Sequence, residues 1–315
     1  MRRRYTVMAI ACAGLVVMAC ADTQQEQAAP QGELPAAGVD ALVARADMFV
    51  EATPAGTQVV FVGTDEAMVP DAYDDAVFVP FSTFSVERNG IPNEFPAPDT
   101  MAGLLQTAGV RNGRIVIVGE PIHAGRAFAA FDYLGMADQV ALQDGGIAAM
   151  RAAADTDAAQ AAVTGGAVET SDGARLETNV RADMIVDADW VNARLNDPDV
   201  AILDARPPAE YSGETPGDGV TRPGHIAGAR NVFWQTLVED PDMPRLKSEQ
   251  ELRSIFRAAG VDDGDTIVAY CRTGGQASFL YTVARYLGYD VKLYDGSYVD
   301  WSATDHPVEG PGSTE

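Results

Sequence analysis

Thr266-Ile267-Val268-Ala269-Tyr270-Cys271-Arg272-Thr273-Gly274-Gly275-Gln276-Ala277-Ser278 is the stretch that decides the fold of this chain. Its short apolar, β-branched beginning predicts a buried strand that stops at Cys271. Beyond the glycines, apolar residues recur at helical spacing as far as Gly288, which predicts a helix that ends there. Cys271 therefore stands where a parallel strand passes into a helix, the place where open α/β sheets hold their ligand sites.

The loop after Cys271 has the composition of an anion cradle. Gly274 and Gly275 can adopt positive φ, so the loop can turn its N–H groups inward. The helix N-terminus adds partial positive charge, and Arg272 adds a full charge. A thiol in this setting is expected to have its pKa lowered from ~8.5 toward ~3.5–7.5. The loop thus predicts a thiolate at the floor of an anion site.

An internal repeat divides the chain into two similar halves. Residues 107–118 match residues 258–269, and Ala108 aligns with Ala259 at an offset of 259 − 108 = 151. Each half follows the order helix, turn, strand, loop, helix, strand and Asp-Gly turn. Earlier strands at 58–62 with 77–80, and at 200–204 with 229–232, complete a parallel sheet in each half. The predicted fold class is α/β, with two parallel sheets flanked by helices.

The N-terminus has the features of an export signal. Three arginines at 2–4 precede an apolar run to about Ala21, which is short for a membrane span but suits a signal peptide. The run ends in Val17-Met18-Ala19-Cys20, which resembles the lipobox of bacterial lipoproteins, with lipidation on Cys20. The alternative is a plain secretory signal or an uncleaved anchor. We expect a protein anchored by lipid to a bacterial membrane, on its periplasmic or cell-surface side.

These features predict five segments along the chain. They are a lipoprotein signal peptide (1–19), a flexible tether (20–38), a degenerate first domain (39–152), a linker (153–180) and a catalytic second domain (181–310). After cleavage and lipidation, Cys271 would be the only thiol of an exported protein, which favours a reactive over a structural cysteine.

Composition excludes several classes of partner. The formal net charge is −24, and no basic patch with interleaved aromatic residues occurs, so nucleic acid is not expected. The three histidines lie far apart without metal-ligand spacing, so we expect no metal site, and nothing indicates an organic cofactor. The oligomeric state stays open.

The two halves differ at the key position. The repeat places Glu120 opposite Cys271, in a shorter loop. Glu120 with His123 could be interpreted as an acid/base pair, and the nearby glycines as a phosphate loop. A carboxylate can replace neither the sulfur nucleophile nor an anion host, so the preferred interpretation is an inactive first domain and a single active site.

Several motifs of the second half resemble the rhodanese family in the family's order. They are Ile202-Leu203-Asp204-Ala205-Arg206-Pro207-Pro208-Ala209-Glu210-Tyr211-Ser212-Gly213-Glu214, Arg222-Pro223-Gly224-His225-Ile226-Ala227-Gly228-Ala229-Arg230-Asn231-Val232, Cys271–Gln276, and Tyr294-Asp295-Gly296-Ser297. The chain is similar to tandem-domain rhodaneses, the thiosulfate or 3-mercaptopyruvate sulfurtransferases. The resemblance implies two rhodanese-like domains, of which the second is catalytic.

The resemblance also implies a mechanism. Cys271 would take sulfur from a small anionic donor, form a persulfide and pass the sulfur to a nucleophile such as cyanide or a thiol. Arg272 would hold the anionic end of the donor, with Thr273, Gly274–Gly275 and Gln276 completing the substrate loop. Loops of the mercaptopyruvate type tend to read Cys-Gly-Ser-Gly, so Cys-Arg favours thiosulfate. Many relatives have a second arginine where this chain has Gln276.

Four further motif residues are interpreted as supports. Asp204 and Arg206 at a strand end are expected to pair and hold the loop beneath the site, and Glu210 belongs with them. His225 is expected to fix a turn through a hydrogen bond rather than to act as a general base.

Two classes of protein other than a sulfurtransferase also use a reactive cysteine. Cysteine phosphatases use a similar cradle but need an arginine six positions after the cysteine, where this chain has Ala277. A non-enzymatic persulfide carrier or binding lipoprotein would keep a reactive Cys271 without efficient turnover, and the sequence leaves this alternative open.

Overall fold

The computed structural model describes residues 57–70, 73, 76–154 and 175–311. All of these residues belong to one compact unit, 35–315. The predicted signal peptide, Cys20 and the tether lie outside the described residues, as does most of the predicted linker. In the described part of the chain, every helix is too short or too polar to cross a membrane.

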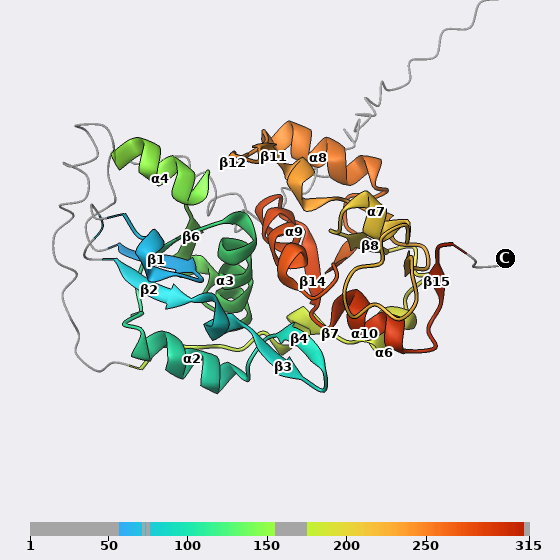
Figure 1. The fold of residues 1–315 in the computed structure, drawn as a ribbon, viewed down its shortest axis with the longest axis horizontal. Coiled ribbons are helices and arrows are strands. Elements are labelled where there is room, and N and C mark those ends of the chain that lie inside the picture. Colours follow the sequence, from blue (N-terminus) through green and yellow to red (C-terminus); the bar gives the residue numbers. More distant parts are fainter. Residues whose placement is uncertain (1–56, 71–72, 74–75, 155–174, 312–315) are drawn as a thin grey trace, which may run out of the picture. The chain divides into compact units, whose positions relative to one another are not determined.

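The first half of the described chain forms a four-stranded parallel sheet in the order β2-β1-β5-β6 (Figure 1). Its strands are β1 (Gln58–Gly63), β2 (Val77–Pro80), β5 (Ile115–Gly119) and β6 (Val140–Leu142), and its helices are α2 (Pro98–Thr107), α3 (Pro121–Tyr133) and α4 (Gly146–Ala154). An antiparallel hairpin, β3 (Val86–Arg88) with β4 (Ile91–Glu94), stands apart from this sheet.

The second half forms a five-stranded parallel sheet in the order β10-β8-β13-β14-β7. Its strands are β7 (Ile185–Val186), β8 (Val200–Asp204), β10 (Arg230–Asn231), β13 (Thr266–Tyr270) and β14 (Asp290–Tyr294). The helices are α6 (Ala188–Asn192), α7 (Pro208–Tyr211), α8 (Glu249–Ala258), α9 (Gly275–Tyr286) and α10 (Ser297–Ala303). Two antiparallel pairs lie outside the sheet: β11 (Val238–Asp240) with β12 (Met243–Leu246), and β9 (His225–Ile226) with β15 (Val308–Glu309).

The predicted fold class is confirmed. Both predicted pairs of parallel strands are present, although β10 is shorter than the predicted 229–232. The deciding stretch forms the central strand β13 and then α9, and Gly288 with φ +86° follows the end of that helix. The apolar run of β13 is buried on both faces, as expected of a strand inside a parallel sheet.

The helices α3 and α9, which follow the equivalent strands β5 and β13, pack directly against each other (Figure 1). A Cβ on Gly125 of α3 would lie 2.7 Å from Cα of Phe279 in α9, so glycine permits the close approach. Farther along α3, the buried Asp132 carboxylate accepts hydrogen bonds from Tyr281 Oη at 2.7 Å and Arg285 Nε at 3.0 Å. The two sheets therefore share one central helix pair and one continuous core.

Gly125→Ala is expected to destabilise the protein, because the added methyl group meets the backbone of α9, which a side-chain movement cannot relieve. We expect the free energy of unfolding to fall by about 1–3 kcal/mol in a denaturant titration. Gly103→Ala is the matched control, since a Cβ there has no atom within 4 Å and Gly103 lies inside α2. That change should stabilise by roughly 0.5–1 kcal/mol. Equal effects of the two changes would contradict the packing described for α3 and α9.

Candidate active site

The loops that follow the two central strands differ in length. Four residues, 271–274, separate β13 from α9, whereas Glu120 alone separates β5 from α3. In the longer loop, Gly274 has φ +92° and precedes the first residue of α9. Gly275 is that first helical residue and does not adopt the positive φ expected for it. The first domain has no room for a comparable cradle, because its strand runs almost directly into its helix.

Cys271 is a free thiol, 2% exposed, at the floor of the longer loop. The Gly274 N–H donates to Cys271 Sγ with a nitrogen-to-sulfur distance of 3.1 Å. The backbone of the cysteine is fixed from the other side, because its N–H donates to Ser297 Oγ at 3.2 Å and its carbonyl accepts from Tyr298 N at 2.9 Å. The start of α10 therefore holds the residue while the start of α9 faces its sulfur.

Burial raises the pKa of the Cys271 thiol above its ordinary value. The backbone N–H groups of Ala277, Thr273 and Gly274 lower this pKa, as the loop composition led us to expect, but they do not offset the burial. The expectation of a lowered pKa for this thiol is thus wrong. The sequence shows the N–H donors but not the depth at which the packed domains place the sulfur.

Arg272 lies beside the cysteine with its side chain 36% exposed. The nearest carboxylate partner is the exposed Asp218, 4.0 Å from Arg272 Nη1. Glu210, which was expected to support the site, also lies close to this guanidinium: burial raises the pKa of its carboxyl, and Arg272 lowers it. Thr273 and Gln276 are half-buried in the same loop and helix start.

Asp204 and Arg206 form the predicted pair. Both side chains are fully buried, and Arg206 Nη2 lies 2.6 Å from Asp204 Oδ2 and donates to the Gly224 carbonyl at 2.8 Å. Burial alone would lower the pKa of Arg206, but the Asp204 carboxylate holds it above its ordinary value. Because β8 pairs with β13 and Asp204 lies opposite Tyr270, the ion pair lies next to the start of the Cys271 loop.

The His225 ring stacks on Tyr211, with ring centroids 3.8 Å apart, and its Nδ1 lies 2.9 Å from the Tyr211 carbonyl oxygen. Its Nε2 lies 3.3 Å from Glu309 Oε2. Both ring nitrogens therefore have partners that join α7 and β15 to β9. This arrangement agrees with a turn-fixing role.

Two residues of the first domain reach the Cys271 loop, and neither was predicted from the sequence. Asn93 donates from Nδ2 to Thr273 Oγ1 at 3.1 Å, and the buried Arg126 lies 2.5 Å from Asp295 Oδ1. Neither belongs to a motif, and each lies more than a hundred residues from its partner. Asp295 belongs to the Tyr-Asp-Gly-Ser motif of the sequence, but the motif does not show which groups its carboxylate contacts.

The described residues include no group of three or more histidine, cysteine, aspartate or glutamate side chains that could hold a metal ion.

Comparison with known proteins agrees with this geometry. The model of the rhodanese-like domain matches residues 187–304, which include β8, β13 and the whole Cys271 loop. The 3-mercaptopyruvate sulfurtransferase of Escherichia coli (strain K12) is 31% identical over 241 residues, 74% of this chain and 82% of that protein. The chain belongs to the rhodanese sulfurtransferase family.

Two further comparisons concern a solved structure and a shorter match. The crystal structure of SseA from Escherichia coli, described as showing the "Rhodanese" fold of 3-mercaptopyruvate sulfotransferases, matches with a TM-score of 0.61 and 26% identity over 82% of this chain and 97% of that chain. The sulfur carrier protein TtuD of Thermus thermophilus is 41% identical over 109 residues, which are 32% of this chain and 38% of TtuD. The predicted family is confirmed, and sulfur transfer is its general chemistry.

Proposed function

We propose that this sulfurtransferase moves sulfane sulfur from thiosulfate, through a persulfide on Cys271, to a nucleophilic acceptor such as cyanide or a thiol. The observation that carries the proposal is the Gly274 N–H placed 3.1 Å from Cys271 Sγ at the start of α9. A backbone donor in this position stabilises negative charge on the sulfur both before and after transfer. Arg272, half-exposed next to it, is available to an anionic donor.

The transfer proceeds in two displacements. The Cys271 thiolate attacks the outer sulfur of thiosulfate, a new S–S bond forms, and the sulfur–sulfur bond of the donor breaks as sulfite leaves with the electron pair. Cyanide then attacks the outer sulfur of the persulfide, so thiocyanate leaves and the thiolate returns. No net oxidant or reductant is needed. Because the loop N–H groups already face the sulfur, they need little reorganisation in either step.

Two alternatives have specific support. A relative that matches 74% of this chain is named for 3-mercaptopyruvate, which favours that donor over thiosulfate. The similarity of 109 residues of this chain to a sulfur carrier protein favours a persulfide carrier without efficient turnover. Multiple-turnover kinetics with each donor separate the three: the higher kcat/KM identifies the donor, and loading without turnover identifies a carrier.

Arg272→Ala is expected to weaken thiosulfate binding, because it removes the partly exposed cation of the Cys271 loop. A charge-assisted hydrogen bond of the usual strength corresponds to a rise in KM of roughly 10- to 100-fold, with a smaller change in kcat. The control is Arg257→Ala on α8, where an exposed arginine lies at the same 4.0 Å from a carboxylate, that of Asp263. An unchanged KM for thiosulfate in Arg272→Ala would rule out this arginine as the donor site.

A further inference from the structure

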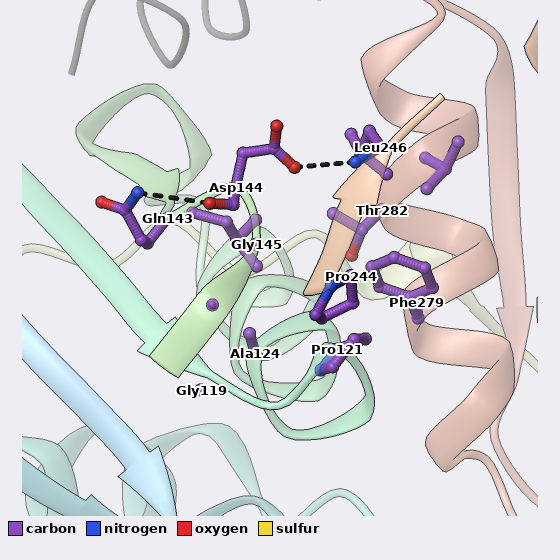
Figure 2. Close-up of a pocket in the computed structure, with 13 residues that line it drawn as sticks. Gly119, Pro121, Ala124, Gln143, Asp144, Gly145, Pro244, Leu246, Phe279 and Thr282 are labelled. Atoms are coloured by element: carbon purple, nitrogen blue, oxygen red, sulfur yellow. Dashed lines mark hydrogen bonds between the residues drawn. The ribbon is translucent and has the colours of Figure 1, made fainter. Parts of the chain in front are cut away.

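Each half has a hairpin that contacts the other half. In the second half, Asp295 Oδ2 accepts from the Phe95 N–H, which follows β4 of the first half, at 2.6 Å. In the first half, Asp144 Oδ1 accepts from the Leu246 N–H, at the end of β12 of the second half, at 2.8 Å (Figure 2). The repeat offset holds for both partners, since 295 − 144 = 151 and 246 − 95 = 151. Each hairpin therefore binds the Asp-Gly turn of the other half.

These two contacts between a hairpin and an Asp-Gly turn have different surroundings. The hairpin β11–β12 closes a pocket beside the short loop of the first half, lined by Gly119, Pro121 and Ala124 among others (Figure 2). The hairpin β3–β4 instead reaches the loop that contains the thiol, where Asn93 Nδ2 donates to Thr273 Oγ1. The same kind of hairpin contact thus lies beside the short loop of Glu120 in the first half and beside the loop of Cys271 in the second.

Asn93 is held in an unusual conformation. Its φ is +62°, a left-handed value that residues other than glycine adopt with some backbone strain. Residues with such strain cluster at functional sites. Its Oδ1 accepts from Ser85 Oγ at 2.7 Å, which orients the amide so that Nδ2 faces Thr273. The backbone carbonyl of Asn93 accepts from Arg126 Nη2. Side chain and backbone are both fixed toward the loop.

Arg126 fixes the same loop from behind. Its side chain is fully buried. Its Nη1 donates to Asp295 Oδ1 at 2.5 Å and to Ser278 Oγ at 3.3 Å. A Cβ on Gly274 would lie 3.1 Å from the same nitrogen. Ser278 Oγ in turn donates to the Gly274 carbonyl at 2.8 Å. One guanidinium of the first domain therefore joins the hairpin, the Asp-Gly turn and the residue whose N–H faces the sulfur.

We propose that Asn93, with Arg126 behind it, is a positioning residue of the sulfur-transfer site, by which the first domain holds the Cys271 loop with its N–H groups on the sulfur. The proposal rests on the proposed function and gives the first domain a role in it. Asn93 touches Thr273, which directly precedes Gly274, whose N–H donates to Cys271 Sγ. Fixing that N–H in advance lowers the barrier to charge movement on sulfur rather than strengthening donor binding.

The test is a double-mutant cycle in the full chain. Asn93→Gly removes the side chain while glycine retains the positive φ without strain. We expect the single-turnover rate constant of persulfide formation at saturating thiosulfate to fall about tenfold, with the half-saturating concentration within about twofold. In a Thr273→Val background the hydroxyl is absent, so Asn93→Gly should have no further effect. In Thr273→Ser the hydroxyl remains, and the tenfold effect should persist.

A matched pair of changes separates positioning from general destabilisation. Asp295→Asn and Asp144→Asn weaken the same hairpin contact in the two halves, and only Asp295→Asn is expected to slow persulfide formation. The proposal is overturned if Asp295→Asn and Asp144→Asn slow persulfide formation equally. It is also overturned if Asn93→Gly has the same effect in Thr273→Val as in Thr273→Ser, or if Asn93→Gly changes only the half-saturating concentration of thiosulfate.

A second readout needs no sulfur donor. Alkylation of Cys271 by iodoacetamide reports the loop directly, and the change in its rate caused by Asn93→Gly should vanish in Thr273→Val and persist in Thr273→Ser. If the wild-type protein forms no persulfide from either donor, the proposed function fails, and this alkylation cycle still decides the positioning role. An alkylation rate that Asn93→Gly leaves unchanged would count against it.

Discussion

Cys271→Ser is expected to abolish sulfur transfer and to leave the fold intact. The hydroxyl cannot form a persulfide, and removing the nucleophile of a covalent mechanism lowers the rate by more than about a thousandfold. The thiol is 2% exposed in a closely packed loop, and serine is slightly smaller than cysteine, so the contacts of the Cys271 backbone to Ser297 and Tyr298 can remain. The measurement is thiocyanate formation from thiosulfate and cyanide, with thermal unfolding followed in parallel.

Glu120→Ala is the matched control for this prediction. Glu120 is the counterpart of Cys271 after strand β5, and its side chain is exposed. Its removal should leave transfer unchanged if the first domain contains no second active site. Activity retained by Cys271→Ser, or lost in Glu120→Ala, would contradict the assignment of the nucleophile.

Asp204→Ala is expected to produce the largest loss of stability. The change leaves the Arg206 guanidinium buried without its counter-ion, because both side chains of the pair are fully buried. Breaking such a pair lowers the free energy of unfolding by about 3–5 kcal/mol. Sulfur transfer should fall as well, since Asp204 lies opposite Tyr270, the residue before Cys271.

A surface ion pair provides the comparison. Asp99 lies 3.3 Å from Arg175, but the two side chains are 92% and 78% exposed. Asp99→Ala should therefore change stability by no more than about 1 kcal/mol. Replacing both members of the buried pair by apolar residues should recover part of the loss seen in Asp204→Ala, because no buried charge is then left unpaired. A loss in Asp204→Ala as small as that in Asp99→Ala would show that the pair does not support the loop.

Much of the fold was predictable from local patterns. The apolar run before Cys271, the helical spacing after it and the internal repeat each depend on residues close together in the chain, and they predicted β13, α9 and the two parallel sheets. The pairing of Asp204 with Arg206 was predictable for the same reason, since only Ala205 lies between them. The Glu120 substitution likewise indicated that the halves differ.

The rest of the site depends on tertiary packing. Asn93 lies on the β3–β4 hairpin and Arg126 on α3, and only the packing of these two elements against the second domain brings them to Thr273 and Asp295. The pKa of Cys271 was predicted with the wrong sign because the sequence shows the N–H donors of the loop but not the burial that opposes them. The sequence therefore predicted an inactive first domain but not the contacts of its side chains with the loop of the sulfur site.

The measurement that tests the central claim most directly is the mass of the Cys271 peptide after incubation with thiosulfate, and again after cyanide. We predict a gain of one sulfur atom on this peptide, which cyanide removes while thiocyanate appears. A gain with 3-mercaptopyruvate instead would change the donor and keep the nucleophile. No gain at Cys271 with either donor, in protein that unfolds cooperatively, would contradict the account.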